Sequence, residues 1–181
     1  MLEMSEFFTN DQLAAMIENS AWEAFHTMLE LELESLPFQR TKHAPSTNDG
    51  VLALVGFAGS WSGAGAFSCT TKMACGIAES LLMTCYMGVQ DDVLDAVGEM
   101  ANIILGNVKG RLEESLGPMY LSVPAIVYGR DFSIQSFGQH EWVLVPFQLG
   151  DERIEIQLYL THTPAAKSAH PGFILPFNAS V

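Results

Sequence analysis

The chain has 181 residues, of which 49% are hydrophobic and 16% are charged. This length and composition are typical of one globular domain with a sizeable core and exclude a disordered chain. The formal charge of −13, from 21 acidic and 8 basic residues, includes no basic cluster, which excludes nucleic-acid binding and disfavours anionic membranes.

The first ten residues lack the features of a secretory signal. They include Glu3 and Glu6 but neither a basic start nor an apolar run. No segment of the sequence reaches the roughly 18 consecutive apolar residues of a membrane span. The odd number of cysteines fits free, buried thiols in a reducing compartment. These cysteines are Cys69, Cys75 and Cys85. We therefore expect a cytoplasmic protein without a membrane span.

The first predicted element is an amphipathic helix over residues 10–36, capped by Asn10 or Asp11. Its apolar face comprises Leu13, Met16, Ile17, Trp22, Phe25, Met28 and Leu29. A polar, proline-containing loop is expected next, from Gln39 to Gly50. The loop leads into a predicted hairpin, in which two β-like runs flank the Gly-Ser-Trp-Ser sequence. These two runs are residues 51–57 and 63–69.

Two further helices are predicted after the hairpin. One covers residues 71–87 and is expected to end at Gly88. The other covers residues 91–115. It begins with two aspartates, which favour the helix dipole, and stops at a Gly-Pro pair.

Three β-like runs complete the predicted domain, at residues 119–128, 141–147 and 153–161. In the last run, alternate positions are aliphatic, which is typical of a strand with one buried face. Residues 163–181 are rich in Pro, Ala, Ser and Gly and are expected to form an extended C-terminal tail. An edge strand is expected within that tail, at residues 173–175.

The order of these elements predicts an α+β domain with two layers. Because the helices and the antiparallel strands fall in separate blocks, we expect an antiparallel sheet covered on one face by two to three helices. The helices include the long one over residues 91–115. The domain should span residues 1–162.

The third predicted helix carries the most informative pattern. Asp95, Glu99 and Asn102 lie within about 60° of one another around the helix, because offsets of four and seven return to the same side. The opposite, apolar side is formed by Val93, Val97, Met100, Ile104 and Val108. The glycines of this helix are Gly98, Gly106 and Gly110. Since glycine costs a helix interior about 1 kcal/mol relative to alanine, we expect close approach to its backbone.

A carboxylate and an amide one turn apart can hold a small polar group between them. The amide of Asn102 both donates and accepts hydrogen bonds, whereas the ionised carboxylate of Glu99 only accepts, so the pair suits a water molecule or a partner's lysine ammonium. The scattered histidines, the absence of a P-loop pattern and the isolated serines predict no metal site, phosphate loop or nucleophilic triad. In most proteins, however, such a pair is simply solvated.

Residues 95–107, Asp-Ala-Val-Gly-Glu-Met-Ala-Asn-Ile-Ile-Leu-Gly-Asn, resemble the signature helix of the CheX branch of the CheC/CheX/FliY phosphatases. In that family an acid or serine is followed by Glu, then by Asn, and about twenty residues later by a proline. Pro124 lies at nearly that distance, one residue short of the commonly described gap. A single Glu–Asn pair is similar to the CheX type, since the CheC type has two. The resemblance covers residues 10–161.

The resemblance implies a hydrolase of chemotaxis or another two-component pathway, one that dephosphorylates the aspartyl phosphate of a CheY-like response-regulator receiver domain. It implies that Asn102 positions the attacking water and that Glu99 anchors the receiver's lysine. The residues implied in partner binding or support are Asp95, Gly98, Gly106 and Pro124. It also implies a homodimer, no cofactor on this chain, and Mg²⁺ in the partner receiver.

Two alternatives stay open. The first is a non-catalytic CheX-like module that binds a receiver domain or another signalling protein without turnover. The second is a purely structural interaction domain, whose binding would not depend on receiver phosphorylation.

Overall fold

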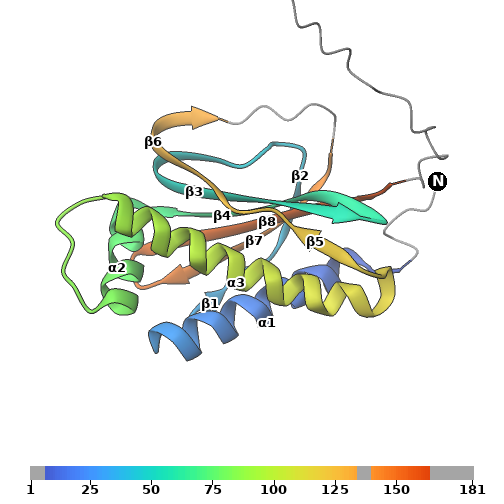
Figure 1. The fold of residues 1–181 in the computed structure, drawn as a ribbon, viewed down its shortest axis with the longest axis horizontal. Helices are drawn as coiled ribbons and strands as arrows, with labels where there is room; N and C mark the ends of the chain where they lie inside the picture. Colours follow the sequence, from blue (N-terminus) through green and yellow to red (C-terminus); the bar gives the residue numbers. More distant parts are fainter. Residues whose placement is uncertain (1–6, 134–139, 164–181) are drawn as a thin grey trace, which may run out of the picture.

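An antiparallel sheet and three helices make up the computed structural model, which describes residues 7–133 and 140–163. The helices are α1 (Asn10–Leu29), α2 (Thr71–Leu82) and α3 (Asp91–Leu116), and all three lie on one face of the sheet (Figure 1). This arrangement confirms the predicted two-layer α+β fold.

The eight-stranded sheet has the order β1-β7-β8-β4-β3-β5, with β2 also paired to β7 and β6 also paired to β3. Its strands are β1 (Glu34–Ser35), β2 (Gln39–Thr41), β3 (Ser46–Gly59), β4 (Trp61–Thr70), β5 (Met119–Leu121), β6 (Ala125–Ser133), β7 (Trp142–Leu149) and β8 (Glu152–His162). Every pairing in it is antiparallel.

The hydrophobic core lies between the helices and the sheet. The predicted apolar side of α3 is completely buried there, with 0% exposure at Val93, Val97, Met100, Ile104 and Val108. The alternating aliphatic residues of β8 are also buried, namely Ile154, Ile156, Leu158 and Leu160. Both predicted periodicities are therefore confirmed, 3.6 residues in the helix and two in the strand.

Helix α1 is shorter than predicted, and its N-cap is Thr9 rather than either of the predicted residues. Thr9 forms a capping box with Gln12, so neither Asn10 nor Asp11 is the cap. The helix stops at Leu29 because Glu30 adopts the left-handed conformation, with φ of 56°. The predicted continuation to residue 36 was wrong because the leucines beyond this turn belong to an extended segment that leads into β1.

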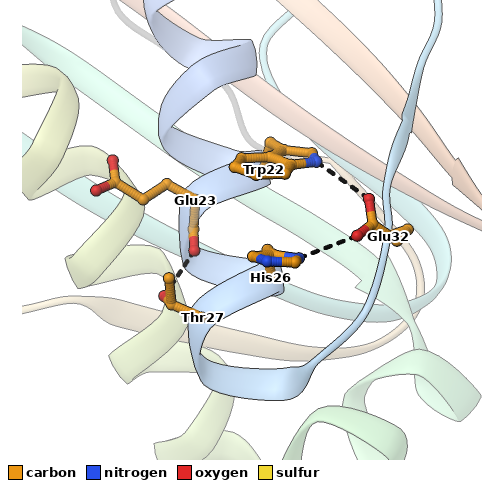
Figure 2. A network of polar contacts seen from close by, with 5 residues as sticks. All are labelled: Trp22, Glu23, His26, Thr27 and Glu32. Atoms are coloured by element: carbon orange, nitrogen blue, oxygen red, sulfur yellow. Dashed lines mark hydrogen bonds and ion pairs between the residues drawn. The ribbon is translucent and has the colours of Figure 1, made fainter.

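Glu32, in that extended segment, turns back onto the last turns of α1 (Figure 2). Its Oε2 accepts a hydrogen bond from Trp22 Nε1 at 3.2 Å, and its Oε1 lies 3.0 Å from His26 Nδ1. The Trp22 and His26 rings stack with centroids 4.7 Å apart. Trp22, predicted to face the core, is therefore a surface residue in the structure, and Met28, predicted to face the core as well, is also exposed.

Helix α2 ends at Leu82 rather than at the predicted Met87. Met83 takes the left-handed conformation, and the N–H of Tyr86 donates to Glu79 Oε1 at 2.9 Å. Because this side-chain contact already closes the helix end, Gly88 is not its terminator. Cys69 and Cys75 are buried as predicted. The prediction of a buried thiol was wrong for Cys85, which is exposed because it lies in this turn after the helix end.

The predicted loop over residues 39–50 contains strand residues at both ends. Gln39–Thr41 form β2, and β3 already begins at Ser46, where it pairs with β6. The predicted hairpin is confirmed, since β3 and β4 pair from Gly50↔Thr70 to Phe57↔Gly63.

The predicted single strand over residues 119–128 is two strands, β5 and β6. Both pair with β3, and residues 122–124 separate them. At this break, the Ser122 N–H donates to the Gly56 carbonyl and Ser122 Oγ accepts from the Gly56 N–H, both at 2.9 Å. Pro124 follows, and without an N–H it cannot donate to a strand pairing. The chain therefore leaves the sheet here and rejoins it at Ala125.

The predicted strand at residues 173–175 and nearly all of the predicted tail lie outside the described residues. Within residues 7–133 and 140–163, no helix is both long enough and apolar enough to cross a membrane.

Candidate functional site

The outward face of α3 carries the predicted polar residues. Asp95 and Glu99 are exposed and Asn102 is half-buried, whereas Val97 and Met100 between them are buried. Because α3 is continuous over 26 residues, the helical offsets of four and seven keep the two carboxylates and the amide on the same side. The structure thus places Asp95, Glu99 and Asn102 on one accessible surface, which we call the polar stripe.

The β5–β6 connection borders the polar stripe. A Cβ atom on Gly98 would lie 3.2 Å from Ile126 Cδ1 and 3.9 Å from Pro124 Cβ. Gly98 itself is buried. Pro124, distant in sequence, is thereby placed beside the helical turn that carries Glu99, and the chain's own side chains fill the space next to Gly98.

The other two glycines of α3 are more open. A Cβ on Gly106 would have Leu121 Cδ1 as its nearest neighbour at 3.9 Å, and a Cβ on Gly110 would meet nothing within 4 Å. Gly106 follows Asn102 by one helical turn. Because no side chain projects from the helix at Gly106, another molecule has room to approach the Asn102 amide.

Two hydrogen bonds anchor the C-terminal half of α3 to β5, and an ion pair within α3 joins the two side chains that make them. Lys109 Nζ lies 2.8 Å from Glu113 Oε2 and donates to the Met119 carbonyl at 3.3 Å. The Met119 N–H donates to Glu113 Oε1 at 2.8 Å. The hydrogen bonds from Lys109 and from the Met119 N–H lower the pKa of Glu113 below its ordinary value. Because β5 leads directly to Pro124, these contacts fix the position of α3 relative to the border of the polar stripe.

The sequence interpretation missed an exposed apolar side chain at the same border. Val123, in the β5–β6 connection, is 87% exposed. Tyr120 is also exposed, but it lies between Met119 and Leu121, which pack in the core, and therefore points to the uncovered face of the sheet. Large exposed apolar side chains beside a polar surface are common where another protein binds. The only signal in the sequence for an exposed apolar side chain was the valine immediately before Pro124, and the sequence interpretation placed it inside a continuous strand.

The chemistry available on the polar stripe is hydrogen bonding and charge. The Glu99 carboxylate can hold a cation or a donor, and the Asn102 amide can orient a small polar molecule. Within residues 7–133 and 140–163, no group of three or more His, Cys, Asp or Glu side chains could hold a metal ion.

Comparison with protein families gives a match to the model of the family described as "Chemotaxis phosphatase CheX", over residues 51–148. That range contains all of α3 and Pro124. A comparison with curated proteins gives no match.

Several solved structures share the fold. The chemotaxis protein CheX from Vibrio vulnificus has 22% sequence identity and a TM-score of 0.72, with 82% of this chain and 99% of that chain covered. CheX in the CheX–CheY–BeF3–Mg²⁺ complex from Borrelia burgdorferi has 25% identity and a TM-score of 0.65, with 81% and 96% covered. Thermotoga maritima FliY has 15% identity and a TM-score of 0.64, with 87% and 91% covered.

Proposed function

Because this chain belongs to the CheX family of chemotaxis phosphatases, we propose that it dephosphorylates the aspartyl phosphate of a CheY-like response-regulator receiver domain. The observation that carries the proposal is the polar stripe, on which Glu99 and Asn102 occupy one accessible face of a helix within the matched residues. The Borrelia burgdorferi relative, solved as a complex with CheY, supports a receiver domain as the partner.

In the proposed reaction, α3 docks over the phosphorylated aspartate of the receiver. The carbonyl oxygen of the Asn102 amide accepts a hydrogen bond from a water molecule and holds the water oxygen in line with the phosphorus atom. The new bond forms between that oxygen and phosphorus, and the bond from phosphorus to the aspartate oxygen breaks. The products are inorganic phosphate and the free aspartate carboxylate.

Glu99 has a positioning role in this proposal. Its carboxylate accepts hydrogen bonds from the ammonium group of the receiver's lysine, which fixes how α3 lies on the receiver. Asp95, Gly98, Gly106 and Pro124 shape and support the docking surface. The Mg²⁺ ion belongs to the receiver, where it neutralises charge on the phosphoryl oxygens.

In this proposal the chain contributes only the positioning of the water molecule and of the receiver, because the metal ion and the phosphorylated aspartate belong to the receiver. Orienting a water molecule for in-line attack contributes mainly by proximity, and a small misplacement costs about 100-fold in rate. A loss of that size corresponds to roughly 2.7 kcal/mol, since 1.36 kcal/mol changes a rate tenfold.

The test measures the lifetime of phosphate on candidate CheY-like receivers, with and without this protein. Asn102→Ala should slow receiver dephosphorylation about 100-fold while receiver binding is retained. Asn107→Ala is the matched control, because it removes the same amide from a half-buried position of the same helix, outside the polar stripe. Its rate should equal that of the wild type.

Glu99→Gln keeps the size of the side chain but removes its charge, and should raise the protein concentration needed for half-maximal rate. If Asn102→Ala dephosphorylates as fast as Asn107→Ala, catalysis does not occur on the polar stripe. If the wild type binds the phosphorylated receiver and leaves the phosphate lifetime unchanged, the protein is a non-catalytic receiver-binding module.

We also propose that the protein is a homodimer. The β1/β2 and β5/β6 ends of the described sheet are edges to which a second copy can pair or pack. Sedimentation equilibrium measures the mass in solution, and a monomeric mass at micromolar concentration would contradict this part of the proposal.

A further inference from the structure

An apolar groove crosses the sheet face that the helices leave uncovered. It has a volume of about 280 Å³, and its lining includes Gly56, Ala64, Trp142 and Tyr159. The alternation of the strands identifies the face. Leu158 and Leu160, on either side of Tyr159, belong to the core beneath the helices, so Tyr159 points to the opposite side.

The small residues give this groove its depth. Gly56 and Ala64 are directly paired neighbours on β3 and β4, and Ala64 is paired in turn with Tyr159 on β8. At one side lie the rings of Tyr159 and Trp142, with their centroids 4.4 Å apart. His140 stacks on Tyr159 at 4.3 Å and only 3% of Trp142 is exposed, so the open part of this aromatic wall belongs to Tyr159. The result is an apolar channel with a floor of small residues and an aromatic wall, a shape that fits large apolar side chains.

The described chain leaves the sheet on the same face as the groove. Thr163, the last described residue, donates its N–H to the Ser60 carbonyl at 2.9 Å and its hydroxyl to Ser62 Oγ at 2.7 Å. Ser62 lies two residues from Ala64 on β4, so both side chains point to the groove side. Thr163 is four residues beyond Tyr159, or roughly 13 Å along the strand direction at 3.3 Å per residue.

The residues that follow include an apolar run within reach. Residues 173–177 read Phe-Ile-Leu-Pro-Phe, and Lys167 is the only Lys, Arg, Asp or Glu among residues 164–181. An extended connection over residues 164–172 spans up to roughly 30 Å, which exceeds the distance from Thr163 to the groove. Pro176 lacks an N–H, which favours docking through side chains over pairing along a sheet edge.

We propose that residues 173–177 fold back across the sheet and occupy this groove, with the rings of Phe173 and Phe177 against its aromatic wall. Four features support residues 173–177 as the occupant. The groove is apolar, and the chain leaves the sheet on the same face. Residues 164–172 are long enough to reach the groove, and residues 164–181 carry little charge. The groove is also lined by Ser122 and Ala125, which flank Pro124. Residues bound in the groove would therefore pack against the β5–β6 connection from the sheet face opposite the helices.

The test places a nitroxide spin label on the tail and observes the tryptophan indole N–H signals by NMR. The protein over residues 1–181 carries Ile174→Cys for labelling and Cys85→Ser, which removes the exposed cysteine. Trp142 reports on the groove, and Trp22, on the exposed surface of α1, is the internal reference. We expect the label to broaden the Trp142 signal strongly and to leave the Trp22 signal sharp.

Phe173→Ser together with Phe177→Ser, in the same labelled protein, should strongly reduce the broadening of the Trp142 signal, because an undocked label spends less time near the groove. Three results would each overturn the proposal. The first is a Trp142 signal as sharp as that of Trp22. The second is broadening of the same size with and without both serine substitutions. The third is Trp142 broadening when spin-labelled, isotopically silent protein is mixed with ¹⁵N protein lacking the label, which would assign the groove to a second copy's tail.

Discussion

Alanine in place of Gly65 should destabilise the protein, because α3 packs against the backbone of β4 at this position. A Cβ atom there would lie 2.7 and 2.8 Å from the two terminal methyl carbons of Leu105 and 3.2 Å from Phe57 Cε2. Leu105 is 0% exposed. Its methyl groups therefore cannot swing into solvent, and the helix or its neighbours must shift.

Two opposing effects set the magnitude. Overpacking a core costs about 1–3 kcal/mol, whereas replacing a strand glycine by alanine recovers about 0.5–1 kcal/mol of backbone entropy. The middle of each range gives a net loss in the free energy of unfolding for Gly65→Ala of about 1 kcal/mol, and the ranges allow up to about 2.5 kcal/mol. For a chain of this size, each kcal/mol lost lowers Tm by roughly 2–4 °C.

Urea unfolding of a double-mutant cycle with Leu105→Ala tests this reasoning. Leu105→Ala alone should cost about 2–5 kcal/mol through the cavity it leaves. Because the methyl group introduced by Gly65→Ala then occupies part of that cavity, the double variant should be about 1–3 kcal/mol more stable than the sum of the single losses predicts. Gly110→Ala is the control, since a Cβ there meets nothing within 4 Å and alanine should stabilise α3 by about 1 kcal/mol. Additive losses at Gly65 and Leu105 would refute the proposed packing.

Two further predictions concern the border of the polar stripe. Glu113→Gln should lower stability at neutral pH. Because the pKa of Glu113 is lowered in the folded protein, its contribution is present above the ordinary carboxyl pKa and is lost as pH falls through the folded value. Urea curves of variant and wild type should therefore converge in acid, and a difference independent of pH would contradict the ion-pair role. Gly98→Val should push Ile126 away from α3 and slow receiver dephosphorylation at least tenfold. Gly98→Ala, whose tightest contact is with the flexible end of Ile126, should stay near the wild-type rate; equal rates for both variants would argue against this contact.

The helix that carries the candidate site could be predicted from sequence because its signals are local. Its apolar residues recur every three to four positions, two aspartates mark its start, and Gly117 directly follows its end at Leu116. The same pattern placed Asp95, Glu99 and Asn102 on the exposed side. Their catalytic and partner-binding roles stay predictions, because exposure on one face is compatible with chemistry, docking and simple solvation.

The errors fall where distant residues decide the local structure. The leucines after Leu29 continue a helical spacing, yet the left-handed conformation of Glu30 ends α1. Nothing near Trp22 in sequence indicates that Glu32 will hold its indole at the surface. The contact of Gly98 with Ile126 is likewise long-range, so the sequence indicated a close approach to that glycine without indicating what approaches.

The hydrogen bonds of Ser122 have a consequence for how this surface can change. An interrupted strand normally leaves its neighbour with unpaired backbone groups, but here Ser122 satisfies both the N–H and the carbonyl of Gly56. Val123 therefore projects from an intact sheet edge, while Pro124 beside it faces Gly98 of α3. Substitutions of Val123 alter the exposed surface without opening β3. The chemistry of this surface and the stability of the fold can thus evolve independently at Val123.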